Sequence, residues 1–205
     1  MNKYASLDLV RRLASGIFLN ILFCLVAFDL RGGDLARRVQ EAYRQAAVLR
    51  ADFVQKTWVD LLEREIEERG DLTLARPDRF RIRYLGPHQR KYLSNGRTLW
   101  MVRPGEETER IVNLEAAVSR EALAFLSGLG EMGREFKVAE DRSRAALTLV
   151  PRSPESPFKK ILLAIDPGTG LAREATLYPR RGNRSHYFFS RVRTGGKVSA
   201  DEFHP

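Results

Sequence analysis

The chain has 205 residues, and its 35 Lys and Arg outnumber 26 Asp and Glu, for a formal net charge of +9 at pH 7. This length suits one ordinary domain, or one domain with a targeting segment. The basic balance favours anionic partners such as nucleic acid or anionic lipid, but a generic solvated surface explains it equally well, and charge does not determine a fold.

The N-terminus begins with a basic stretch and continues with an apolar run from Ile17 to Phe28. This order is typical of an export signal, and the run is shorter than the roughly 20 residues of a membrane span. We therefore predict a signal peptide over residues 1–33 and a folded domain over 34–205. The residues before the possible cleavage sites match a signal-peptidase site poorly. An uncleaved membrane anchor therefore remains an alternative, as does a buried N-terminal helix. Cleavage near residue 33 would remove the only cysteine, Cys24.

Apolar residues at helical spacing predict an amphipathic helix over residues 34–49, with Asp34 as its cap. The stretch "ADFVQKTW" over 51–58 follows, and its β-forming residues favour a strand. The next stretch, "VDLLEREIEER" over 59–69, has helical periodicity, so the residues alone favour a helix there.

Strand patterns dominate after Gly70, and the run "RFRIRYL" alternates cleanly between apolar and basic residues. The alternation predicts two faces, with Phe80, Ile82 and Tyr84 on one and Arg79, Arg81 and Arg83 on the other. Such a strand can bury one face in a core, present a basic surface to phosphate, or form the wall of a site for an apolar ligand. Further along, Asn95-Gly96 between two apolar runs predicts a hairpin with a type I′ turn.

The middle of the chain changes character, because residues 113–133 have helical spacing that glycines divide into short pieces. Five strands are predicted after it, over 135–141, 145–151, 158–166, 171–179 and 184–194. Helix, strands, helical insertion and strands again predict a mainly β, α+β domain. Its expected form is one curved antiparallel sheet with helices packed on one side.

Signals for catalysis are missing from the sequence. His88, His186 and His204 stand at no metal-ligand spacing, and there is no nucleophile elbow, phosphate loop or dinucleotide fingerprint. We predict that the protein is not an enzyme and uses no metal or cofactor. Sheets that bind nucleic acid stack bases on exposed aromatic residues flanked by basic ones. In residues 79–84 the aromatic and the basic residues are predicted on opposite faces of the strand, so we predict no nucleic-acid partner.

Several short blocks, taken in order, are similar to the periplasmic outer-membrane lipoprotein carrier family, LolA. The similarity runs from about Leu35 to the end of the chain. It rests on a Phe-x-Gln block, a Gly-x-Leu…Arg-Pro-x-x-Phe block, a hairpin block and a final "DEFHP": Phe53 and Gln55; Gly70, Leu72, Arg76, Pro77 and Phe80; Asn95, Gly96, Leu99 and Trp100; and residues 201–205.

The resemblance implies an incomplete antiparallel β-barrel with a helical lid over an apolar cavity, and a hairpin rather than a helix over 59–69. The cavity would hold the acyl chains of lipoproteins that cross the periplasm from an inner-membrane release complex to an outer-membrane receptor, if one is present. The carrier would be a monomer. Because the sequence stops at Pro205, without the further segment of some members, transfer to a dedicated receptor stays open. The alternative function is a lipid- or protein-sensing accessory module of a membrane transporter or regulator.

By position, Arg76 would be a latch that hydrogen-bonds the lid, although an arginine at a sheet edge that caps a carbonyl is the plainer alternative. Residues 81 and 83 would face water. The resemblance and the strand alternation together give a set of cavity-lining candidates, which a simple packed core would use as well: Phe53, Leu72, Leu74, Phe80, Ile82, Tyr84, Leu99 and Met101, with Ile161, Leu163 and Phe188 as further candidates of less certain strand phase.

Overall fold

The computed structural model describes residues 33–112 and 132–205. The predicted signal peptide, except for Gly33, and most of the predicted helical insertion lie outside the described residues. The described elements, in chain order, are α2 (Asp34–Gln45), β1 (Val48–Val59), the 3₁₀ turn η1 (Asp60–Leu62), β2 (Arg64–Ala75), β3 (Arg79–Leu85), β4 (Arg90–Asn95), β5 (Thr98–Val102), β6 (Glu109–Val112), α5 (Met132–Glu135), β7 (Phe136–Asp141), β8 (Ala146–Pro151), β9 (Phe158–Ile165), β10 (Ala172–Pro179), β11 (Arg184–Thr194) and the 3₁₀ turn η2 (Ala200–Phe203).

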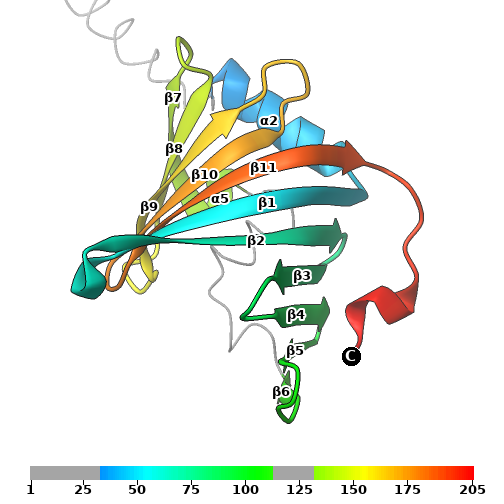
Figure 1. Cartoon of the computed structure of the whole chain (residues 1–205). Helices are drawn as coiled ribbons and strands as arrows, with labels where there is room; N and C mark the ends of the chain where they lie inside the picture. The colour runs from blue at the N-terminus through cyan, green and yellow to red at the C-terminus, as the bar shows by residue number, and fades with distance from the viewer. Residues whose placement is uncertain (1–32, 113–131) are drawn as a thin grey trace, which may run out of the picture. The chain divides into compact units, whose positions relative to one another are not determined.

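The strands form one antiparallel, 11-stranded sheet in the order β6-β5-β4-β3-β2-β1-β11-β10-β9-β8-β7. Figure 1 shows this sheet curving, with α2 lying across one side of it. We call that side the inner face and the opposite side the outer face. The sheet is open, because β6 and β7 stand at its two ends. A mainly β fold with an open antiparallel sheet and few helices confirms the predicted fold class.

The long β1–β2 hairpin confirms the hairpin that the family resemblance implied over 59–69, and it corrects two local predictions from helical periodicity. Residues 59–69 turn through η1 and enter β2, with Glu63 in the left-handed region (φ 47°). The first helix ends at Gln45 rather than residue 49, because Val48 already pairs with Ala75. Sheet pairing satisfies these backbone groups and buries Val48 and Leu49, which outweighs the weak local helical preference, while Leu61 and Leu62 at the tip of the hairpin stay exposed.

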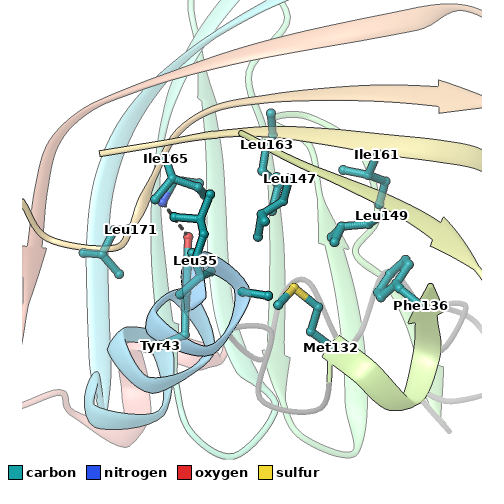
Figure 2. Packing of buried hydrophobic residues seen from close by; sticks show 14 of the residues in the cluster. Leu35, Tyr43, Met132, Phe136, Leu147, Leu149, Ile161, Leu163, Ile165 and Leu171 are labelled. Atoms are coloured by element: carbon teal, nitrogen blue, oxygen red, sulfur yellow. Dashed lines mark hydrogen bonds between the residues drawn. The ribbon is translucent and has the colours of Figure 1, made fainter. Parts of the chain in front are cut away.

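The main core lies between α2 and the inner face of β8, β9 and β10. The helix contributes Leu35, Val39 and Tyr43, all buried, and Ala172 N–H donates to Tyr43 Oη at 3.2 Å. Figure 2 shows Tyr43 among the leucines and isoleucines of the strands, with Met132 and Phe136 closing one end. The strands contribute a fully buried layer: Leu147, Leu149, Ile161, Leu163, Ile165 and Ala175.

The N-terminus of α2 is held by a carboxylate from β7. Glu140 Oε1 accepts from Ala36 N–H at 2.8 Å, which satisfies one of the free amides of the first turn. A negative charge here also complements the positive end of the helix dipole. Gly33 makes room for this contact, because a Cβ there would lie 2.1 Å from Glu140 Oε2.

A second, smaller core lies on part of the outer face. The C-terminal turn η2 packs on β3 and β4 and buries Phe203 completely. Its neighbours are Val48, Ala75 and Val198. The final "DEFHP" block is therefore structural, since its phenylalanine fixes the C-terminal segment against the sheet.

The β4–β5 hairpin is confirmed, but its turn differs from the predicted one. The two connecting residues are Gly96 and Arg97, and of these only Gly96 has a positive φ (94°). That is the pattern of a type II′ turn rather than type I′. Asn95 acts through its side chain instead, because Asn95 Oδ1 accepts from the amides of Arg97 and Thr98, each at 3.0 Å.

Candidate functional site

Strand register determines which of the predicted residues lie on the inner face. Phe53 stands opposite Gly70, Leu72 opposite Ile82, and Ile82 opposite Tyr92. Since residues directly opposite each other share a face, the same side continues to Met101 through its pairing with Tyr92. The eight main cavity-lining candidates all lie on this face: Phe53, Leu72, Leu74, Phe80, Ile82, Tyr84, Leu99 and Met101.

The inner face has two parts that differ in burial. Beneath α2 the apolar side chains form the fully buried core described above. Towards β6, the buried apolar side chains of the described residues are Phe80 and Leu99, at 3% and 7% exposure. The apolar side chains around them remain partly exposed: Leu72, Leu74, Ile82, Tyr92, Met101 and Ile111. We call this second part, on β2 to β6, the apolar half-face. A surface of this kind can bind the hydrocarbon part of a ligand.

Aromatic and polar groups border the apolar half-face at β1 and β3. The rings of Phe53 and Tyr84 meet edge to face at 5.1 Å, and Tyr84 Oη donates to Gln55 Oε1 at 2.6 Å. Arg90 stacks 3.6 Å over the Tyr84 ring and makes a two-pronged ion pair with Glu68, at 2.6 and 3.0 Å. Burial raises the pKa of the Tyr84 phenol. The hydroxyl therefore stays neutral at physiological pH and keeps donating.

Gly70 explains why the Phe-x-Gln and Gly-x-Leu blocks belong together. A Cβ on Gly70 would lie 2.0 Å from the Arg83 carbonyl oxygen and 2.5 Å from Phe53 Cζ. The Phe53 ring can lie this close to β2 because Gly70 has no side chain. Four inner-face residues were not singled out from the sequence, and the register identifies them: Tyr92, Ile111, Tyr187 and Phe189.

Arg76 lies at the corner between β2 and β3, and its side chain is exposed. Its Nη1 donates to the carbonyl oxygen of Arg44 at 3.0 Å, in the last turn of α2. Its backbone amide donates to the Ala47 carbonyl at 3.0 Å. Arg76 thus caps the carbonyl end of α2, where a cation also complements the helix dipole. The lid that Arg76 was predicted to hold was given no residue range, and most of the predicted helical insertion over 113–133 lies outside the described residues.

The three further cavity-lining candidates, whose strand phase was less certain, do not all lie where they were predicted. Ile161 and Leu163 face inward, but they are fully buried in the core beneath α2 and form no open surface. The prediction for Phe188 was wrong. It pairs with Val54 on the outer face, and its ring lies 4.1 Å from that of His186. Tyr187 and Phe189 occupy the inner positions instead.

Two further features bear on the kind of site. Among residues 33–112 and 132–205, no group of three or more His, Cys, Asp or Glu is placed to hold a metal ion. The helices in the same ranges are too short or too polar to span a membrane.

These features define the class of the protein: a mainly β domain whose open sheet presents an apolar inner face beside a helix. The family follows from the sequence. Residues 44–205 match the family described as "Outer membrane lipoprotein carrier protein LolA", and the chain belongs to this family.

Individual relatives agree with this assignment. The chain is 24% identical over 194 residues to an outer-membrane lipoprotein carrier protein of Azotobacter vinelandii, covering 91% of this chain and 93% of that one. It is 27% identical over 161 residues to the protein of the same description in Methylococcus capsulatus, covering 77% and 76%. The crystal structure of an uncharacterized conserved protein from Thermus thermophilus shares the fold, with a TM-score of 0.50, 10% identity, and 84% and 91% of the two chains covered.

Proposed function

We propose that this protein is a periplasmic carrier that binds the acyl chains of lipoproteins and moves them from the inner to the outer membrane. Membership of the LolA family supports this function, as do relatives described as outer-membrane lipoprotein carrier proteins. The observation that carries the proposal is the apolar half-face, where side chains such as Ile82 and Met101 are only partly buried. Acyl chains would lie against these residues.

A carrier of this kind must either bury the acyl chains of its cargo incompletely or undergo an unfavourable conformational change when cargo binds. A triacylated lipoprotein has roughly 40 methylenes, and burying all of them at ~0.8 kcal/mol each would release on the order of 30 kcal/mol. Non-covalent affinities saturate near roughly −18 to −21 kcal/mol. A carrier that buried every methylene at no cost would never release its cargo.

The hydrogen bond from Arg76 to α2 supplies an opposing free energy. A hydrogen bond with a charged donor contributes about 1.5–3 kcal/mol. If cargo binding moves α2 and breaks this bond, the empty, closed state gains that amount relative to the loaded one. Affinity for cargo is lowered, and release becomes possible.

The partners follow from this role. They are acylated lipoproteins, an inner-membrane complex that releases them, and an outer-membrane receptor if one is present. The carrier would work as a monomer, without a cofactor.

The test is release of newly made, palmitate-labelled lipoproteins from spheroplasts by the purified protein, with the heat-unfolded protein as control. We expect soluble complexes that contain this protein and labelled lipoproteins. Labelled lipoproteins that stay on the membrane, while the added protein remains folded, would contradict the carrier function. That result would favour the accessory-module alternative.

A further inference from the structure

The outer face of the sheet contains a hollow of about 570 Å³, on the side opposite the apolar half-face. Its charged side chains come from outward-facing residues of β11, β1, β2 and β3. We call this hollow the arginine groove, because six arginines line it: Arg50, Arg69, Arg81, Arg83, Arg191 and Arg193. The groove gives a reason for the alternation in "RFRIRYL". One face of this strand contributes apolar side chains to the inner face of the sheet, and the other contributes arginines to the groove.

The carboxylates of the groove leave it with a positive excess. Asp71 pairs with Arg83 Nη2 at 2.7 Å and with Arg81 Nη2 at 3.5 Å. Asp52 pairs with Arg191. Two glutamates outside the lining also pair with these arginines, Glu67 with Arg69 and Glu202 with Arg50 and Arg81. Four carboxylates therefore stand against six guanidinium groups. The imbalance favours an anionic ligand, and the walls of the hollow hold the arginines close enough together to act on one.

The C-terminal segment shows which anion the groove accepts. Glu202 of η2 places Oε1 3.4 Å from Arg50 Nη2 and Oε2 3.6 Å from Arg81 Nη1. The same Arg50 Nη2 also donates to the Lys197 carbonyl oxygen at 3.1 Å. A chain segment outside the sheet thus already meets these arginines with one carboxylate and one backbone carbonyl. These are the two acceptors that an acidic peptide offers.

Two further arginines of the groove can be reached by a second such segment. Arg193 is exposed, and the side chain of Arg69 is 73% exposed. Arg69 pairs with Glu67 at 2.9 Å, but this ion pair lies in water and can be exchanged for a pair with an incoming carboxylate. Beneath them β1 and β2 are paired on both sides, so a ligand would be held by side chains and not by adding a strand. From β3 to β11 the groove crosses four neighbouring strands, about 14 Å, which an extended peptide of about five residues spans.

We propose that the arginine groove binds an acidic, extended peptide segment of a partner protein. The guanidinium fork matches carboxylates in a two-pronged way, and this gives the contact specificity as well as charge. A flat bilayer suits the site less well, because the charge lies in a hollow. The groove lies on the face away from the proposed cargo site, so a partner could dock there while cargo is bound.

The test measures fluorescence anisotropy of a labelled, alternating Glu/Ser peptide of about eight residues, titrated with the purified protein. The groove variant is R69E/R193E, which changes two exposed side chains. The matched control is R97E/R144E, which changes two exposed residues in the β4–β5 and β7–β8 turns and alters the net charge equally. We expect saturable binding that weakens about tenfold in the groove variant, stays unchanged in the control, and falls as salt is raised.

Several outcomes would overturn the proposal. Equal weakening in the two variants would mean that general charge, and not the groove, attracts the peptide. Absence of peptide binding would remove the acidic segment as ligand. Binding to vesicles of anionic phospholipid, but not to the peptide, would make the groove a membrane contact. None of these results bears on release of lipoproteins from spheroplasts, so the two proposals fail separately.

Discussion

Arg76 Nη1 and the carbonyl oxygen of Arg44 lie 3.0 Å apart, and their hydrogen bond ties the β2–β3 corner to the last turn of α2. At the other end of the helix, Glu140 accepts from the amide of Ala36. The helix that covers the core is therefore held at both ends by charged side chains, each of which complements the nearer end of the helix dipole. Any movement of α2 away from the sheet must break these contacts.

Replacing Arg76 by Leu should loosen the C-terminal turn of α2. Without the guanidinium, the Arg44 carbonyl loses a charged donor, so we expect faster amide hydrogen exchange over the last turn of the helix. Because the closed state loses its advantage, the variant should accept lipoproteins but transfer them several-fold more slowly to acceptor membranes. Exchange by mass spectrometry and a transfer time course measure the two effects.

Arg97→Leu is the matched control, since Arg97 is an exposed arginine in the β4–β5 turn. It should leave both exchange and transfer as in the unaltered protein. Equal transfer rates for Arg76→Leu and the unaltered protein would show that Arg76 is a helix cap and no latch.

Gly70→Ala should destabilise the protein by about 1–3 kcal/mol, because the new methyl would overlap the Phe53 ring and the Arg83 carbonyl. Gly133→Ala is the control: a Cβ there meets no atom within 4 Å, and its φ is not in the left-handed region. Urea unfolding of the two variants measures the difference. Equal midpoints would mean that Phe53 can leave its place over Gly70 at no cost.

Tyr43→Phe should cost about 1–3 kcal/mol, because the buried Ala172 amide loses its acceptor. Tyr178→Phe is the control, since the ring of Tyr178, which the variant keeps, contacts Lys160 at 4.7 Å. Urea unfolding at neutral pH compares them. A neutral effect of Tyr43→Phe would show that another group or water replaces the hydroxyl.

The same tyrosine predicts a loss of stability at alkaline pH. Burial raises the pKa of the Tyr43 phenol, so the folded state favours the neutral form. A pKa raised on folding contributes stability below the unfolded value, about 10, and that contribution is lost as pH rises above it. Between about pH 9 and 11 the free energy of unfolding should therefore fall more steeply in the unaltered protein than in Tyr43→Phe. Parallel curves would contradict this assignment.

Alternation within strands made the apolar half-face predictable from the sequence. Phe80, Ile82 and Tyr84 lie on one face because side chains alternate with a period of two, and the arginines between them leave only one assignment. The failure at Phe188 has the same origin. Residues 187–189 are all aromatic, so alternation cannot distinguish the faces, and only pairing with β1 decides.

Other features depend on contacts that lie far apart in the sequence. The helical spacing of residues 46–49 gave no sign that Val48 would pair with Ala75 across the β1–β2 hairpin. The arginine groove likewise forms only when β11 comes to lie beside β1, which brings Arg193 opposite Arg50. Composition left an anionic partner and a generic solvated surface equally open, and the place where the charge gathers follows from topology.

The most direct test of the carrier function asks which face of the sheet meets acyl chains. A photoactivatable amino acid would replace Met101, which faces inward, or Val102, its neighbour on the opposite face. Each variant would be expressed in cells fed labelled palmitate and then irradiated. We predict labelled lipoprotein adducts at position 101 and not at 102. Equal labelling at the two positions, or adducts at position 101 that contain no palmitate, would contradict acyl-chain binding on this face.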